Sequence, residues 1–353
     1  MANLRPPAPL RQDISALRQA LTGPRGGSVY PFLTLDFALW TLDSPFMRIL
    51  VIGSVNMDVV ARVDHVPAAG RNVRGSGLRT IPGGKGANQA VAAARLGAET
   101  AFLGRVGDDE FGARLRASLE AEGVGVDALE TVRDCASGVA LILVDAEGEN
   151  TIVVTPGANG RLTPDDVDAA RALLAAADAV VLQLEIPSET VARAVALARE
   201  VGTPTVVDAG PPRRPVDEAV FGSTILTPNE AEAASLLAVE PGSMGIEEMA
   251  GALLARGPQA VVLKAGPRGA VVARGTECVT VPAFAIDPVD TTAAGDAFTA
   301  KLAVEAVKGT DLVAAARVAN AAGALACLKL GAQPSMPTDD EIAEFLEDQP
   351  KAS

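Results

Sequence analysis

The stretch Met47-Arg-Ile-Leu-Val-Ile-Gly-Ser-Val-Asn-Met-Asp-Val-Val60 determines the fold that we expect. Positions 49–52 within it are consecutive apolar residues, and the run stops at Gly53, where small and polar residues begin. An uninterrupted apolar strand is typical of a parallel sheet whose two faces are both covered. We therefore expect a buried central strand just after Met47.

Apolar runs and amphipathic segments alternate along the rest of the chain. Thr163 followed by Pro164, for example, is typical of a helix start, with an N-cap residue before a proline in the first turn. The alternation predicts an α/β fold, a three-layer sandwich with a central, mostly parallel sheet and helices on both faces. Strands are expected at 48–52, 100–106, 179–184, 205–208, 223–226 and 260–264, and helices at 88–96, 109–122, 164–176, 188–201, 230–238 and 297–307.

Two regions interrupt this alternation. Segments 57–62 and 71–81, and segments 138–144 and 150–155, look like antiparallel strand pairs, the second joined by the turn sequence Asp-Ala-Glu-Gly-Glu. We expect them to form a small β-sheet that projects from the main body. Such a sheet can act as a lid over a site at the strand ends.

The first 46 residues differ in composition from the rest. They contain the only tryptophan, Trp40, and the only tyrosine, Tyr30, together with the PPAP and GPRGG sequences. We interpret 1–46 as an N-terminal extension, either poorly ordered or upstream of a biological start at Met47; a short helix at 11–21 is the alternative. Residues 47–349 then form one folded unit, with lid strands near 57–81 and 138–155.

The composition excludes several classes of protein. The net charge is −14, with 44 acidic against 30 basic residues, the opposite of what phosphate neutralisation on a nucleic acid requires. The single histidine, His65, rules out sites with two or three histidine ligands. The three cysteines form no CxxC pair. The longest apolar stretch, 312–330, contains charged and amide residues, so we expect a buried helix, no membrane span and a cytoplasmic protein.

The strongest chemical signal is Asp290-Thr-Thr-Ala-Ala-Gly-Asp-Ala-Phe298. The small residues Ala293, Ala294 and Gly295 allow close approach of the backbone, and an apolar helix is expected to follow. Backbone N–H groups at a helix start form an anion hole, which the helix dipole strengthens. Asp296 beside such a hole is suited to act as a general base that activates a hydroxyl while the hole stabilises a transferred phosphoryl group. A helix N-cap role is the alternative.

Three glycines occur in Gly83-Gly-Lys-Gly-Ala-Asn-Gln-Ala90, just before an expected helix. The segment is not a P-loop, because Arg79 stands where that pattern has its first glycine, four residues removed from Gly-Lys, and Gly86 stands where it has Ser or Thr. The backbone of Gly83 and Gly84 and the amide of Asn88 are suited to hydrogen-bonding a polyhydroxyl ligand. A strand-to-helix turn without a ligand is the alternative.

Polar side chains follow the first strand. Asn56 and Asp58 are two residues apart, so they share one face of an extended segment. They lie where α/β sheets bind ligands, and a carboxylate can accept hydrogen bonds from two sugar hydroxyls. A solvated turn is the alternative.

The segment Thr227-Pro-Asn-Glu-Ala-Glu232 opens another helix. Glu232 lies one turn into it and could hold Mg²⁺ through water, since hard cations prefer oxygen ligands. A capping arrangement with Asn229 is the alternative, and the segment taken alone favours it.

The order and spacing of these segments resemble the ribokinase-like family of carbohydrate kinases over about 47–349. The resemblance rests on GSVNMD, GGKGANQA, GENTIVVTPGAN, LQLE, TPNEAE, KAGPRG, DTTAAGDAF and KLGAQPSMP. It implies ATP-dependent phosphorylation of D-ribose to ribose 5-phosphate, with Mg²⁺ and an activating monovalent cation, normally K⁺. It also implies a homodimer that pairs through the lid sheet.

The resemblance further implies roles for individual residues. Lys85 has two interpretations. It is a ligand of the sugar or of a phosphate group, or its side chain points into solvent. The sugar ligands would be Asn56, Asp58, Gly83, Gly84, Lys85, Asn88 and Glu185, with Asp296 as the base and Ala293, Ala294 and Gly295 as the anion hole. The nucleotide would be bound by Asn229, Lys264, Gly266, Gly269 and Asn320, and Mg²⁺ by Glu232 through water. K⁺ would be ligated by Asp290, Thr292, the carbonyls of Ala326, Lys329 and Gly331, and the Ser335 hydroxyl.

Three positions depart from the family pattern. Lys264 stands where the family often has Thr, Asn320 stands where it can have His, and Asp208 brings a charge near the phosphates in place of the more usual Asn. The alternatives to a ribose kinase are a family kinase for deoxyribose, a ketohexose or a nucleoside, and a non-catalytic sugar-binding sensor. In every case the partners are a small sugar or nucleoside and, for a kinase, ATP, rather than nucleic acid or membrane.

Overall fold

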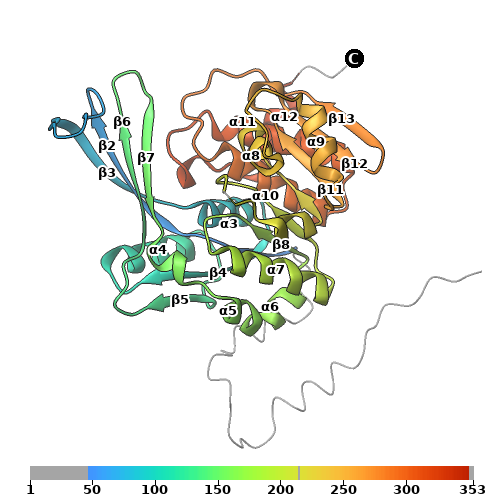
Figure 1. Cartoon of the computed structure of the whole chain (residues 1–353), viewed down its shortest axis with the longest axis horizontal. Coiled ribbons are helices and arrows are strands. Elements are labelled where there is room, and N and C mark those ends of the chain that lie inside the picture. The colour runs from blue at the N-terminus through green and yellow to red at the C-terminus, as the bar shows by residue number, and fades with distance from the viewer. Residues whose placement is uncertain (1–46, 214, 350–353) are drawn as a thin grey trace, which may run out of the picture. The chain divides into compact units, whose positions relative to one another are not determined.

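The computed structural model of the protein describes residues 47–213 and 215–349, so the predicted extension 1–46 lies outside them. A nine-stranded sheet forms the centre of this unit, in the order β13-β12-β11-β10-β9-β8-β1-β4-β5 (Figure 1). In the sheet order, each strand from β11 to β5 is parallel to its neighbour, whereas β12 is antiparallel to both β11 and β13. The strands are β1 Arg48–Ile52, β4 Glu99–Gly107, β5 Leu129–Val132, β8 Ala179–Leu182, β9 Thr205–Val207, β10 Ile225–Leu226, β11 Ala260–Lys264, β12 Ala270–Arg274 and β13 Glu277–Val281.

The first strand, β1, is buried on both faces, as its apolar sequence predicts. Ile49 and Val51 pack in a core cluster with apolar residues of α3, α10 and α11. Leu50 and Ile52 point to the opposite face, because successive side chains of a strand alternate, and they are equally inaccessible to solvent. The helices are α3 Lys85–Arg95, α4 Glu110–Ala121, α5 Pro164–Ala169, α6 Arg171–Ala176, α7 Ser188–Val201, α8 Glu230–Leu237, α9 Ile246–Leu254, α10 Ala294–Val307, α11 Leu312–Ala326 and α12 Asp339–Glu347. The predicted α/β sandwich is confirmed.

The lid is a four-stranded sheet in the order β3-β2-β6-β7, which projects from the main body in Figure 1. Both predicted antiparallel pairs form, β2 with β3 and β6 with β7, and parallel pairing of β2 with β6 joins them into one sheet. The prediction that 71–74 belong to a strand is wrong, since β3 begins at Gly75. The lid strands are β2 Asn56–Val63, β3 Gly75–Gly83, β6 Gly138–Val144 and β7 Asn150–Thr155.

Several predicted element boundaries differ from the structure. The helix expected at 164–176 is interrupted at Ala170 and forms α5 and α6. The helices expected from 88 and from 297 begin three residues earlier, at Lys85 and at Ala294, directly after N-cap residues with positive φ, Gly84 and Ala293. Strands β5, β12 and β13 and helices α9 and α12 were not predicted. Among the described residues, no helix is long and apolar enough to cross a membrane.

Candidate active site

Asp296 is the third residue of α10, and its side chain is almost inaccessible to solvent. The N-cap alternative is wrong, because Ala293 holds that position, with φ 60°. The Asp296 carboxylate instead accepts hydrogen bonds from Asn88 Nδ2 and Gln89 Nε2, each at 2.9 Å. Burial raises the pKa of Asp296, and the Lys85 ammonium partly offsets this. Two side chains of α3 therefore orient a carboxylate that binds a proton more readily than an exposed one.

The segment 293–296 beside Asp296 was expected to form the anion hole, but only some of its backbone N–H groups are unpaired among the described residues. The amide of Ala294 donates to Thr291 O at 3.3 Å, and that of Asp296 donates to Ala293 O at 3.0 Å. Within the described part of the chain, the amides of Ala293 and Gly295 donate to no protein acceptor. These two groups, at the positive end of α10, are best placed to receive an anion.

Two lysines and a buried aspartate lie next to this helix start. Asp208 follows β9 and has no solvent exposure. Its carboxylate lies 2.9 Å from Lys264 Nζ and 3.5 Å from Lys85 Nζ. Burial alone would raise the pKa of Asp208, but these ammonium groups hold it below its ordinary value. Lys85 Nζ also lies 3.8 Å from Asp296, so the alternative that Lys85 points into solvent is wrong.

Two buried glutamines connect the acidic groups. Gln89 Nε2 donates to both Asp208 Oδ2 and Asp296 Oδ1, each at 2.9 Å. Gln183 Nε2, after β8, donates to Gln89 Oε1 at 2.6 Å and thereby fixes the orientation of the amide. Sequence reasoning missed both residues as site residues. The available signal was a glutamine among the alanines of the helix 85–95, because an amide at a core position needs partners.

Asp58 faces this cluster from the lid. A methyl group built on Gly83 would lie 2.3 Å from Asp58 Oδ2, so only glycine at 83 leaves room for the carboxylate. Burial, followed by the charges of Glu185 and Asp296, raises the pKa of Asp58 to about 7. Asn56 is buried and accepts from Asn159 Nδ2 at 2.7 Å, so the solvated-turn alternative is wrong.

Glu185 is held by the chain around the glycine turn. Its Oε2 accepts from Ser54 Oγ at 2.5 Å and from the Lys85 amide at 3.1 Å. Gly84, with φ +89°, allows the turn to pass so close to residues 54–56 that a methyl group there would lie 2.7 Å from the Asn56 amide. The expected strand-to-helix turn is therefore present, and it also brings sugar-ligand candidates together.

Asn229 and Glu232 form the capping arrangement that their segment favours. Asn229 Oδ1 accepts from the Glu232 amide at 2.9 Å, and Glu232 Oε2 accepts from the Asn229 amide at 2.7 Å. Burial raises the pKa of Glu232. A methyl group on Gly210 would lie 2.4 Å from Glu232 Oε1 and 3.0 Å from Lys85 Nζ, so the second oxygen faces the charged cluster.

The described residues contain no group of three or more His, Cys, Asp or Glu side chains arranged to hold a metal ion. A carboxylate oxygen is nevertheless the donor that Mg²⁺ prefers, and Mg²⁺ commonly keeps several waters and binds substrate phosphates. Glu232 Oε1 therefore fits a Mg²⁺ ion held through water and phosphate, and does not fit one enclosed by protein ligands alone.

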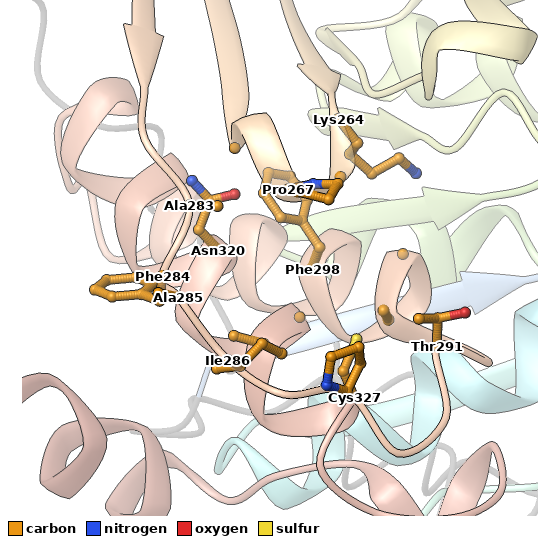
Figure 2. A pocket seen from close by; sticks show the side chains of 17 residues that line it. Lys264, Pro267, Ala283, Phe284, Ala285, Ile286, Thr291, Phe298, Asn320 and Cys327 are labelled. Carbon is orange, nitrogen blue, oxygen red and sulfur yellow. The ribbon is translucent and has the colours of Figure 1, made fainter.

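A pocket of about 540 Å³ lies beside the start of α10 (Figure 2). Its lining is mostly apolar, with Phe284 and Ile286 among the residues, and Lys264 lies at the far side from Phe284. Gly266 and Gly269 line it with φ +54° and +91°. Asn320 Nδ2 donates to the carbonyls of Val281 and Pro282 at 3.2 Å. The predicted nucleotide residues other than Asn229 therefore share one cavity.

The predicted cation ligands come only partly together. Asp290 accepts from the Thr292 amide and from the Gly331 amide, each at 2.9 Å, which brings the loop before α10 against the loop after α11. Ser335 is buried, and its hydroxyl donates to Ala332 O at 2.8 Å. No hydrogen bond or ion pair joins Ala326 or Lys329 to Asp290 within the described chain; Lys329 Nζ pairs with Glu341.

Known proteins share this chain's sequence and fold. Residues 47–339 match the family described as pfkB family carbohydrate kinase. A ribokinase of Bacillus subtilis is 42% identical over 299 residues, covering 85% of this chain and 99% of that protein. A deoxyribokinase of Salmonella typhi is 34% identical and covers 85% of this chain and 99% of its own length.

Solved structures of ribokinases are also similar to this chain. A ribokinase of Thermotoga maritima is 32% identical with a TM-score of 0.78, and covers 86% of this chain and 100% of its own. An Arabidopsis thaliana ribokinase complexed with ribose and ATP is 29% identical with a TM-score of 0.77, with the same coverage. The match over most of the chain, together with the site described above, shows that the protein belongs to the pfkB family of carbohydrate kinases.

Proposed function

We propose that the protein transfers the γ-phosphoryl group of ATP to the primary hydroxyl of D-ribose and forms ribose 5-phosphate. The observation that carries the proposal is the position of Asp296, a buried carboxylate between Asp58 of the lid on one side and the pocket at α10 on the other. The ribokinases similar to this chain support ribose as the substrate.

The polar groups around Asp296 suit a sugar. Asn88 Nδ2 is bound to Asp296, while Asn88 Oδ1 is buried and, within the described residues, has no hydrogen-bond partner. Buried polar atoms are rarely left unpaired, so this oxygen is suited to accept from a hydroxyl of the substrate. Asp58, Glu185 and the Gly83–Gly84 backbone supply further acceptors and donors on the lid side.

Phosphoryl transfer depends mainly on positioning and charge stabilisation. In the proposed reaction, Asp296 accepts the proton of the sugar hydroxyl as the oxygen attacks phosphorus. The amides of Ala293 and Gly295 bind the phosphoryl oxygens at the positive end of α10. Closure of the lid excludes water, which would otherwise compete as the acceptor. Glu232 would hold Mg²⁺ through water, and the ion would supply charge neutralisation at the phosphates.

We propose that a monovalent cation, normally K⁺, binds near Asp290 and Thr292, with carbonyls of Ala326, Lys329 and Gly331 and the Ser335 hydroxyl as further ligands. The hydrogen bonds of Asp290 to both loops support this placement. A cation there would stabilise the loop that leads into the Ala293–Gly295 amides. We also propose that 47–349 is the kinase domain, since every proposed site residue lies within it, and that the protein acts in the cytoplasm.

An assay of ADP release across pentoses, hexoses and nucleosides tests the function. D-ribose should give the highest kcat/KM, because the ligand set matches a small polyhydroxyl substrate. A higher value for deoxyribose, a ketohexose or a nucleoside would assign another kinase activity. Ribose binding without ATP turnover would indicate a sugar sensor. The same assay on a chain beginning at Met47 should give unchanged rates.

Replacing K⁺ with a bulky organic cation should depress the rate in that assay, since such a cation cannot enter a site of carboxylate and carbonyl oxygens. Na⁺ and K⁺ at equal ionic strength provide the comparison. A rate indifferent to the cation would remove Asp290, Thr292 and Ser335 as ligands.

Asp296→Asn should lower kcat by roughly 10²–10⁴-fold with little change in either KM, as expected when a general base is lost. Asn preserves the size of the side chain. Asp109→Asn is a matched control, because Asp109 caps α4 by accepting from the Gly112 amide. Near-normal turnover of D296N would contradict the base role.

Asp58→Asn should weaken ribose binding and stabilise the ligand-free protein at high pH. The Asp58 carboxyl has its ordinary pKa of 3.8 when unfolded and about 7 when folded. Its contribution to stability is therefore fully present below pH 4 and is lost as pH rises through about 7. The gain in Tm of D58N over wild type should grow between pH 4 and pH 8. A gain independent of pH would contradict the raised pKa.

The lid should join two copies of the chain. Leu78, Leu141 and Val153 are 70, 48 and 57% exposed. By strand register they share the lid face opposite to Asp58, and such an apolar patch is typical of an interface. Val153→Asp should convert a dimer into a monomer in analytical ultracentrifugation. Val279→Asp, at an exposed valine of β13, should not. A monomeric wild type at assay concentrations would contradict the dimer.

A further inference from the structure

Lys264 is the only charged residue among the 17 that line the pocket at α10. It ends β11, and Figure 2 shows its ammonium nitrogen pointing away from the apolar end at Phe284. A ligand with an apolar ring and an anionic tail fits such a pocket in one direction only. The tail would point toward Lys264.

The Lys264 ammonium also lies over the start of α10. A methyl group built on Gly295 would be 3.6 Å from Lys264 Nζ. The free amide of Gly295 and the positive end of the helix therefore lie next to a full positive charge. Together these groups favour an anion more strongly than a helix start alone.

The hydrogen bonds of the Lys264 ammonium are incomplete. Its side chain is 12% exposed, and among the described residues its one acceptor is Asp208 Oδ1, at 2.9 Å. An ammonium group has three N–H donors. Two donors are therefore left for a ligand, while Asp208 compensates the burial of the charge.

Asp208 is also linked to the proposed base. Gln89 Nε2 donates to Asp208 Oδ2 and to Asp296 Oδ1, so one amide group separates the two carboxylates. The Lys264 ammonium is one hydrogen bond beyond Asp208. In the proposed reaction the attacking sugar oxygen is at Asp296 and the phosphoryl group is at the start of α10, next to the Lys264 ammonium.

We propose that Lys264 binds the terminal phosphoryl group of the nucleotide, and that Asp208 is a positioning residue that holds the Lys264 ammonium over the start of α10. The inference deepens the proposed function and rests on it for ATP as the nucleotide. It gives the two residues one joint role, in which Asp208 acts through Lys264.

Binding of nucleotides by calorimetry, without sugar, tests the inference. The ligands are a non-hydrolysable ATP analogue, ADP and adenosine, each with Mg²⁺. Lys264→Met should weaken the ATP analogue by about 10- to 100-fold, as expected for a hydrogen bond to a charged group. Binding of adenosine should not change, and the loss for ADP should be several-fold smaller than for the analogue. In turnover, kcat should fall by about 10²–10³-fold.

Lys308→Met is the matched control, because the Lys308 ammonium pairs with Glu305 and Asp339 at the other end of α10. It should leave all three affinities unchanged. Equal losses for the ATP analogue and ADP in K264M, or no loss, would overturn the inference.

A double-mutant cycle with Asp208→Asn separates the role from folding. K264M leaves the Asp208 carboxylate buried with Lys85 as its remaining ammonium partner, whereas D208N/K264M removes both charges of the Asp208–Lys264 pair. Thermal unfolding shows whether each variant is folded. The double variant should fold and lose the analogue affinity to the same extent as K264M. D208N should weaken the analogue in the wild-type background and have no effect in the K264M background. Recovery of wild-type affinity in the double variant would overturn the inference.

The binding measurements use no sugar, so they test the role of Lys264 separately from the proposed phosphorylation of ribose. A protein that fails to phosphorylate ribose but shows the predicted loss of analogue affinity retains the Lys264 assignment. A protein that phosphorylates ribose and shows no such loss retains the function alone.

Discussion

The site depends on one shared amide. Gln89 Nε2 donates to two buried carboxylates, Asp208 and Asp296, which would otherwise repel each other across a region that water does not reach. A buried ionised carboxylate is costly without partners. Gln89 and the Lys85 ammonium supply those partners to both acids at once. With this bridge in place, the proposed base Asp296 and the proposed anion hole at the start of α10 can lie side by side.

The fold brings these groups together because the parallel strands end at one edge of the sheet. Gln183 follows β8, Asp208 follows β9, and Lys264 ends β11. These residues lie far apart in the chain but are brought close by the order of the strands. Helices α3 and α10 then present Gln89 and Asp296 to the same edge. Ligand sites outside the carboxyl ends of strands are the general rule for open α/β sheets.

Local patterns in the sequence were enough to predict most of the main body. Segments 48–52, 188–201 and 260–264 were predicted with the bounds that the structure has, because unbroken apolar runs and helical periodicity report on burial directly. Strands β12 and β13 were missed. β13 is largely exposed, with Val281 as its buried residue, and so has no apolar run to mark it.

The sequence was enough to predict the charged and glycine residues of the candidate site. It was not enough to predict the hydrogen bonds and ion pairs that join them. Asp296 and Asp58 were identified from their positions in short motifs. The pairing of Asp208 with Lys264 was not, since the two residues are 56 positions apart and neither motif implies the other. At the sequence level they were two separate departures from a family pattern. In the folded chain they form one ion pair.

The short connection between β1 and β2 has a consequence for how the protein responds to its ligands. Only residues 53–55 separate a strand at the centre of the core from the lid strand that carries Asn56 and Asp58, and these three residues are buried. A sugar that contacts both Asp58 and Asp296 therefore binds one arrangement of lid and core better than any other. By thermodynamic linkage, anything that favours that arrangement raises the affinity for the sugar by the same factor by which the sugar favours it. A second molecule that bound the outer lid face more tightly in that arrangement would thus be coupled to the sugar without touching it.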